Sequence, residues 1–182
     1  MHDNPEKFNA GLANSLYGLA SGLDDCGRVS NTIPYSSEAI EIRRRLVAND
    51  PSTFEPDLAN SLHNHALYTR KAGRVKEAVG YGQDAVEIWR RLVLDDPEKF
   101  NGDLAESLYN LASDLYNCGR VADAIPFSCE AIEIQRQLVA NDPSEFEPNL
   151  ADSLHNHALY TRKAGRITEA VGCGQDAVEI LS

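Results

Sequence analysis

The chain has 182 residues, 42% of them hydrophobic, and no run approaches the roughly 18 apolar residues of a membrane-spanning helix. Its 17 lysines and arginines against 28 acidic residues give a formal charge of −11, which repels nucleic-acid backbones and anionic lipid surfaces. The composition therefore predicts no transmembrane segment, no nucleic-acid partner and no membrane partner. The polar N-terminus, MHDNPEKFNAG, has the character of neither a signal nor a transit peptide and predicts a cytoplasmic protein.

A repeat of 46 residues organises the whole chain. Pro5, Pro51, Pro97 and Pro143 are evenly spaced, and the string SLHNHALYTRKAGR occurs unchanged at 61–74 and 153–166. The units therefore alternate in type, as expected for two tandem copies of a two-unit block. Fixed periods of this length are typical of solenoids, in which each unit buries its apolar face on its neighbours. We expect a single all-α domain over 1–182, with repeats at about 5–50, 51–96, 97–142 and 143–182, the last one truncated.

Each repeat contains two helical patterns, which are clearest in the first. Apolar residues recur every three or four positions from 12 to 23, with Leu12 and Leu19 on the predicted buried face. This first helix, helix A, is expected to end at Gly27. A second stretch from 29 to 47 predicts helix B, which ends before Pro51 because proline does not easily continue a helix.

Other periodic residues mark the turns and connectors. Glycine recurs between helices A and B, where a left-handed backbone conformation is expected, at Gly27, Gly73, Gly119 and Gly165. Phenylalanine recurs after each proline, where we expect it to precede the next helix and pack on its first turns, at Phe8, Phe54, Phe100 and Phe146. Glycines inside helix B predict close approach of a neighbouring helix at Gly80, Gly82, Gly172 and Gly174.

These features resemble the tetratricopeptide repeat. Helix A reads L-x-x-L-A-x-x-L, as at Leu108, Leu111, Ala112 and Leu115, and a glycine turn then leads to a helix B with alanine at its crossing points. The period exceeds the usual 34 residues, and the extra residues are expected at the end of helix B and in the Asp-Pro-x-x-Phe connector. Long repeats of this kind are similar to those of kinesin light chains and of fungal and bacterial signalling proteins.

The resemblance implies a right-handed α-solenoid whose A helices line a concave groove that holds an extended peptide or a partner helix. Three asparagines match the helix-A residue by which family members hold a ligand backbone: Asn64, Asn110 and Asn156. An amide suits this role because it both donates and accepts hydrogen bonds. The alternative is that these asparagines only solvate an exposed face. Other groove-facing residues in this register are Tyr17, His63, Tyr109 and His155.

Two basic pairs stand beside these asparagines in an otherwise acidic chain. Arg70-Lys71 and Arg162-Lys163 suggest a ligand that is acidic or carries a carboxylate, as in the carboxylate clamps of the family. The alternative is that they are solvated cations favoured by the negative end of the helix dipole.

No metal, cofactor or catalytic site is predicted. His63 and His65 lie two positions apart, which places them on different sides of a helix, so they cannot share an ion. His65 and His157 replace leucine on the buried face, and we expect neutral imidazoles with Thr69 and Thr161 as candidate hydrogen-bond partners. The cysteines form no CxxC pair, which predicts reduced thiols at Cys26, Cys118, Cys129 and Cys173.

Three hypotheses for the function follow. The first is a protein-interaction scaffold that binds its partner in the A-helix groove. The second is self-association through uncapped repeat ends, because the last helix B stops at 179–182 and an uncapped end exposes apolar surface. The third is a spacer segment of a larger signalling protein. None of them requires an enzyme, since no Gly-rich phosphate loop, serine elbow or converging carboxylates occur in the sequence.

Overall fold

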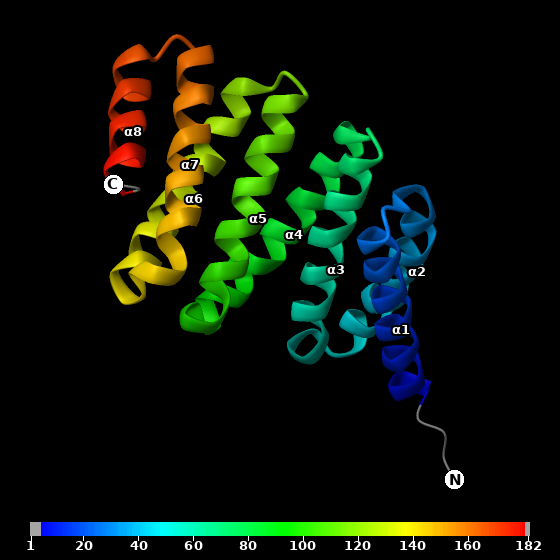
Figure 1. The fold of residues 1–182 in the computed structure, drawn as a ribbon. Coiled ribbons are helices and arrows are strands. Elements are labelled where there is room, and N and C mark those ends of the chain that lie inside the picture. Colours follow the sequence, from blue (N-terminus) through cyan, green and yellow to red (C-terminus); the bar gives the residue numbers. More distant parts are fainter. Residues whose placement is uncertain (1–4, 181–182) are drawn as a thin grey trace. The chain divides into compact units, whose positions relative to one another are not determined.

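The computed structural model describes residues 5–180 and is all-α, as predicted (Figure 1). Eight helices occur in this part of the chain. They are α1 (Pro5–Asp25), α2 (Val29–Asn49), α3 (Pro51–Lys71), α4 (Val75–Asp95), α5 (Pro97–Asn117), α6 (Val121–Asn141), α7 (Pro143–Lys163) and α8 (Ile167–Ile180). The odd-numbered helices are the predicted A helices and the even-numbered ones the B helices. Among the described helices none is both long enough and apolar enough to span a membrane.

The chain divides into two compact units, Met1–Leu92 and Val93–Ser182. In the first unit α1 packs against α2 and α2 against α3. In the second, α5 packs against α6, α6 against α7 and α7 against α8. Each unit thus contains two helix-turn-helix repeats, and a single domain over the whole chain stays a prediction. The predicted uncapped end also stays a prediction, and its last two residues lie outside the described range.

The A helices begin at the periodic prolines, so the connector between repeats is shorter than predicted. Asp50, Asp96 and Asp142 are the N-caps, and the Oδ1 of Asp96 accepts a hydrogen bond from the backbone N–H of Lys99 at 3.1 Å. Proline suits the first helical position because its missing N–H has no partner there anyway. The extra residues of the long period therefore lengthen helix A at its start, and this corrects the predicted connector.

The periodic phenylalanines accordingly lie inside the A helices and not before them. Phe100 is buried, and Phe54 packs against a small core of Ala13, Ile42 and Leu46. Phe8 differs, because 71% of its surface is exposed. A structural role as predicted therefore fits Phe54 and Phe100 but not Phe8.

The turns between helices A and B adopt the predicted left-handed conformation. The backbone φ angles are 70° at Gly27, 79° at Gly73 and Gly119, and 82° at Gly165. After Gly73, the N–H of Arg74 donates to the carbonyl of Thr69 at 2.9 Å, which satisfies a carbonyl at the end of α3.

Two packing predictions are wrong. A Cβ added at Gly80, Gly172 or Gly174 would meet nothing within 4 Å, so no helix approaches closely there. Gly82 is buried, and close approach there stays a prediction. Leu12 and Leu19 are exposed although their spacing predicts burial, and Leu19 is 46% exposed. At the equivalent positions of the second and fourth repeats, His65 and His157 contact Ser36 on α2 and Ser128 on α6, and no helix of the described chain precedes α1.

Candidate functional site

Polar side chains join the A helices within each unit. In the first, the Nδ2 of Asn64 on α3 donates to the Tyr17 hydroxyl on α1 at 2.8 Å and to the Oδ1 of Asn60 at 2.9 Å. In the second, the Nδ2 of Asn156 on α7 donates to the Tyr109 hydroxyl on α5 at 2.9 Å. Each of these asparagines is therefore oriented by a tyrosine of the preceding A helix, a contact that the sequence did not predict.

Asn110 is placed differently, since its Nδ2 donates to the backbone carbonyl of Glu106 within α5, at 3.1 Å. His63 is half-buried on α3, and His155 is exposed on α7. The structure thus leaves all of the predicted groove asparagines outside the core.

The predicted basic residues lie in the last turns of α3 and α7. The Nζ of Lys71 forms an ion pair with Asp24 at 2.6 Å, so a carboxylate of the chain itself occupies this lysine. Arg70 is half-buried, whereas Arg162 and Lys163 are exposed. The basic pair of the second unit is therefore the more accessible to a ligand.

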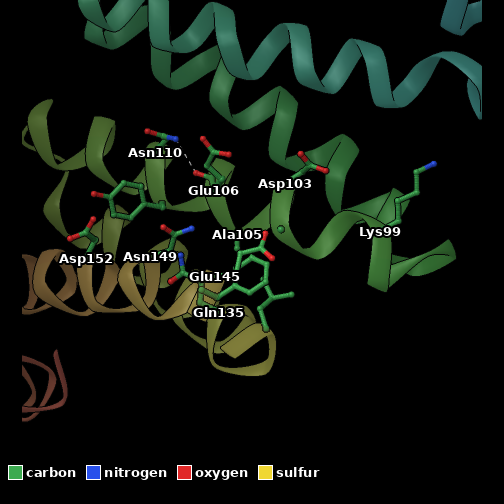
Figure 2. A pocket seen from close by; sticks show the side chains of 13 residues that line it. Lys99, Asp103, Ala105, Glu106, Asn110, Gln135, Glu145, Asn149 and Asp152 are labelled. Atoms are coloured by element: carbon green, nitrogen blue, oxygen red, sulfur yellow. Dashed lines mark hydrogen bonds between the residues drawn. The ribbon is translucent and has the colours of Figure 1, made fainter. Parts of the chain in front are cut away.

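The second unit contains a pocket of about 510 Å³ (Figure 2). Side chains of α5 and α7 form most of its wall, and α6 contributes Gln135. Its charged and amide lining consists of one ammonium group, four carboxylates and three amides, on Lys99, Asp103, Glu106, Glu145, Asp152, Asn110, Gln135 and Asn149. The pocket is therefore negatively charged, in contrast to the basic ends of the A helices.

The first unit holds a buried arginine between its A helices. The Nη1 of Arg43 donates to the backbone carbonyl of Asp57 at 2.7 Å and to the Ser61 hydroxyl, and its Nη2 donates to the Oδ1 of Asn14 at 2.7 Å. The guanidinium carbon lies 5.0 Å from the centre of the Tyr17 ring. Burial lowers the pKa of Arg43, while the nearby Asp57 carboxylate opposes this effect.

The two core histidines are buried as predicted, but their hydrogen-bond partners differ. The Nδ1 of His65 lies 2.7 Å from the Ser36 hydroxyl, and the Nδ1 of His157 lies 2.7 Å from that of Ser128. Thr69 and Thr161, the expected partners, donate instead to the backbone carbonyls of these histidines. Burial lowers the pKa of His65 to about 4.

A cluster that the sequence did not predict surrounds the other ring nitrogen of His157. Its Nε2 lies 3.2 Å from the Oε1 of Glu169 on α8 and 3.9 Å from the Sγ of Cys129 on α6. The three residues come from three helices, so no motif along the chain reveals them. Burial raises the pKa of the Cys129 thiol.

The fold and its polar A-helix face define a class, the helix-turn-helix repeat proteins. Within that class, residues 58–98 and 104–144 match the family model described as tetratricopeptide repeat. Tetratricopeptide repeats are thus shown over these two stretches, which confirms the resemblance there. A search of curated protein sequences gave no match.

Solved structures show the same fold. BtubC (BKLC) from P. vanneervenii is 22% identical with a TM-score of 0.77, over 93% of this chain and 63% of that one. A putative kinesin light chain with nearly identical TPR-like repeats from Podosopora anserina is 24% identical with a TM-score of 0.65, over 99% and 77%. Aspartyl phosphate phosphatase F from Bacillus subtilis is 15% identical with a TM-score of 0.71, over 94% and 40%. The chain spans less than two thirds of the first and third of these proteins.

Proposed function

We propose that the chain is a non-catalytic, cytoplasmic interaction module whose A helices hold an extended segment of a partner protein. The observation that carries this proposal is the 510 Å³ pocket between A helices of the second unit. Tetratricopeptide repeats are generally protein-interaction scaffolds, and the pocket lies on the helices that would face the ligand. Its amides can pair with the backbone of an extended peptide whatever the peptide's side chains.

The charges of the second unit suggest how such a segment would lie. Asp152 lines the pocket, and Arg162 follows ten residues later on α7, which is about 15 Å along a helix. We expect the partner to place a carboxylate near Arg162 and Lys163 and a positive or neutral group in the pocket. The carboxylate that the sequence leads us to expect in the ligand would thus lie at the basic end of the groove, outside the pocket.

Selection of random peptides displayed on phage tests this function even while the partner protein is unidentified. A selected peptide should bind a variant with Asn64, Asn110 and Asn156 all replaced by alanine at least about tenfold more weakly, because several backbone hydrogen bonds are lost. The matched control replaces Asn31 and Asn141, exposed asparagines on B helices, and should retain the parent affinity. Equal binding by the triple variant, with unchanged circular dichroism, would rule out the groove.

A further inference from the structure

The two units differ at one buried position that decides whether a pocket exists. Arg43 in the first unit corresponds to Gln135, 92 residues later, in the second. Both side chains are buried, but glutamine is shorter and carries no charge. The guanidinium group therefore fills a space between A helices in the first unit, whereas Gln135 lines a pocket in the second.

The groups that hold the Arg43 guanidinium have counterparts in the second unit, and those of Tyr17, Asp57 and Asn14 line the pocket. Ser61 and Tyr17 correspond to Ser153 and Tyr109, which are the same residue types. The Asp57 position, which offers its backbone carbonyl, corresponds to Asn149, and Asn14 corresponds to Glu106. A guanidinium acceptor set is thus present in the second unit, with a carboxylate in place of one amide.

Two buried polar atoms, one on the pocket wall and one next to the pocket residue Asp152 in the chain, have no partner in the described residues. These are the Oε1 of Gln135 and the Oγ of Ser153. The two residues are only 4% and 2% exposed. In the first unit the corresponding Ser61 hydroxyl accepts a hydrogen bond from Arg43. Buried polar groups are normally hydrogen-bonded, so these two atoms call for a donor.

The residues around the pocket also carry more negative charge than the residues at the equivalent positions of the first unit. Gly11, Asn14, Thr53 and Asn60 are replaced by Asp103, Glu106, Glu145 and Asp152, and only Asp57 changes the other way, to Asn149. The second unit has therefore lost the arginine that was inside and gained carboxylates around the space. This charge pattern favours a cationic ligand.

We propose that the pocket of the second unit binds the guanidinium group of an arginine side chain from the partner protein. The inference rests on the function proposed above and names the chemistry of the ligand. A planar guanidinium can donate to Glu106 and the Asn149 carbonyl together and lie over the Tyr109 ring, as Arg43 does with its own neighbours. A lysine ammonium matches this fork less well.

Titration with N-acetyl-L-arginine amide, followed by NMR, tests the pocket directly. We expect saturable shifts near Tyr109 and Ser153, and at least about tenfold weaker binding of the isosteric citrulline amide, which lacks the charge. The lysine amide should bind with intermediate affinity. Equal affinity for arginine and citrulline amides would overturn the inference.

A substitution within the chain gives the sharpest control. Gln135→Arg supplies the guanidinium internally and should abolish binding, while Gln137→Arg adds the same charge on the exposed side of α6 and should leave it unchanged. Arg43 shows that an arginine fits between equivalent helices. If Gln135→Arg does not fold, Glu106→Gln is the deciding variant, and we expect it to bind arginine amide more weakly.

Unchanged affinity for arginine amide in a folded Gln135→Arg or in Glu106→Gln would contradict binding of a guanidinium in this pocket. If arginine amide fails but selected peptides still depend on the asparagines, only this inference is lost.

Independently, the geometry points to a divalent-cation site of the zinc class at Cys129, His157 and Glu169. The three ligand atoms lie within 4.8 Å of one another on α6, α7 and α8. A tetrahedral zinc ion places nitrogen and oxygen ligands about 3.3 Å apart and sulfur and nitrogen about 3.6 Å apart. The distances of 3.2 Å and 3.9 Å around the Nε2 of His157 are close to these values.

The orientation of His157 also suits metal binding. Its Nδ1 faces the Ser128 hydroxyl, which itself donates to the backbone carbonyl of Ile125 at 2.9 Å. Because the hydroxyl hydrogen of Ser128 is donated to that carbonyl, the Ser128 oxygen accepts a hydrogen bond from Nδ1–H of His157. The Nε2 of His157 then carries no hydrogen and has a free lone pair. Metal-binding histidines are commonly oriented in this way by a hydrogen bond to the other nitrogen. The lone pair then faces a carboxylate oxygen, and a cation between them removes the repulsion.

The first unit again offers a comparison. Ser37 replaces Cys129, and Glu77 forms an ion pair with Arg74 at 2.6 Å, while the Nε2 of His65 has no partner among the described residues. In the second unit Arg166 approaches only the other oxygen of Glu169, at 3.4 Å. Binding would release the Cys129 thiol proton to solvent, because the thiolate is the metal ligand.

Zinc titration of chelator-treated protein tests this site. We expect uptake of one zinc ion per chain, a higher melting temperature with zinc, and a sulfur-to-metal absorption band with cobalt. Cys129→Ser should weaken zinc binding at least about tenfold, since serine is a poor zinc ligand. Cys118→Ser and His65→Leu should retain it. No uptake by the parent, or equal uptake by Cys129→Ser, would show that His157 and Glu169 form a hydrogen bond only.

Discussion

The hydroxyl of Ser36 lies 2.7 Å from the Nδ1 of His65, and this contact joins the B helix of one repeat to the A helix of the next. The ring is fully buried and meets Tyr81 edge-on, with ring centres 4.2 Å apart. Glu77 and Arg74 are the charged groups that act on it, with opposite effects on its pKa, and burial outweighs both.

Stability should therefore fall on acidification through His65. Its folded pKa of about 4 lies below the unfolded value near 6.5, so the unfolded state binds protons first as the pH drops below about 6.5. The contribution of the neutral ring is complete above that pH and is lost progressively toward pH 4. Between pH 7.5 and 5.5 the loss is about 1.3 kcal/mol.

Urea denaturation of the parent and of His65→Leu at the two pH values measures this effect. Leucine is the residue at the equivalent buried position 111. The variant should lose about 1 kcal/mol less than the parent on acidification, and the remaining histidines cancel in the comparison. Equal losses would mean that the ring is protonated in the folded chain.

Alanine should have opposite effects at two glycines of the same repeat. Gly80→Ala in the middle of α4 should raise the free energy of unfolding by roughly 0.5–1 kcal/mol, because the site is open and glycine weakens a helix interior. Gly73→Ala should lower it by about 1–2 kcal/mol, because the φ of 79° is costly for any residue with a Cβ. The denaturant midpoint of each variant, compared with the parent at an unchanged m-value, measures both effects. A stabilising Gly73→Ala would contradict the turn geometry.

The buried Arg43 should contribute far more to the stability of the fold than its exposed neighbour Arg44. Arg43→Gln should cost roughly 2–4 kcal/mol of stability, because Asn14 and Ser61 lose a charged donor and a cavity opens. Arg44→Gln breaks only a surface ion pair with Asp84 and should cost less than about 1 kcal/mol. Thermal unfolding of the two variants makes the comparison, and equal effects would show that the Arg43 contacts contribute little.

The periodic residues predict the helices well because their signals are local. A proline at the first helical position and a glycine at the turn act on the backbone beside them, so Pro51 marks the start of α3 and Gly73 the turn after it. The predicted connector is too long because the sequence pattern alone does not show that Asp50 is the N-cap of a helix beginning at the proline.

The site could be predicted only in part, since it depends on contacts between helices. The asparagines follow from their register, but their tyrosine partners lie 47 residues away on another helix. The exchange of Arg43 for Gln135 is visible in the sequence, yet its consequence appears only where three helices meet around the pocket. The same holds for Cys129, His157 and Glu169.

Mapping of backbone amide shifts with a peptide selected on the folded chain tests peptide binding by the A helices most directly. We expect the largest changes on α5 and α7 around the pocket, over residues 102–110 and 145–156, with little change on the exposed side of α6. Changes concentrated on the B helices, or none at saturating peptide, would contradict the proposed function.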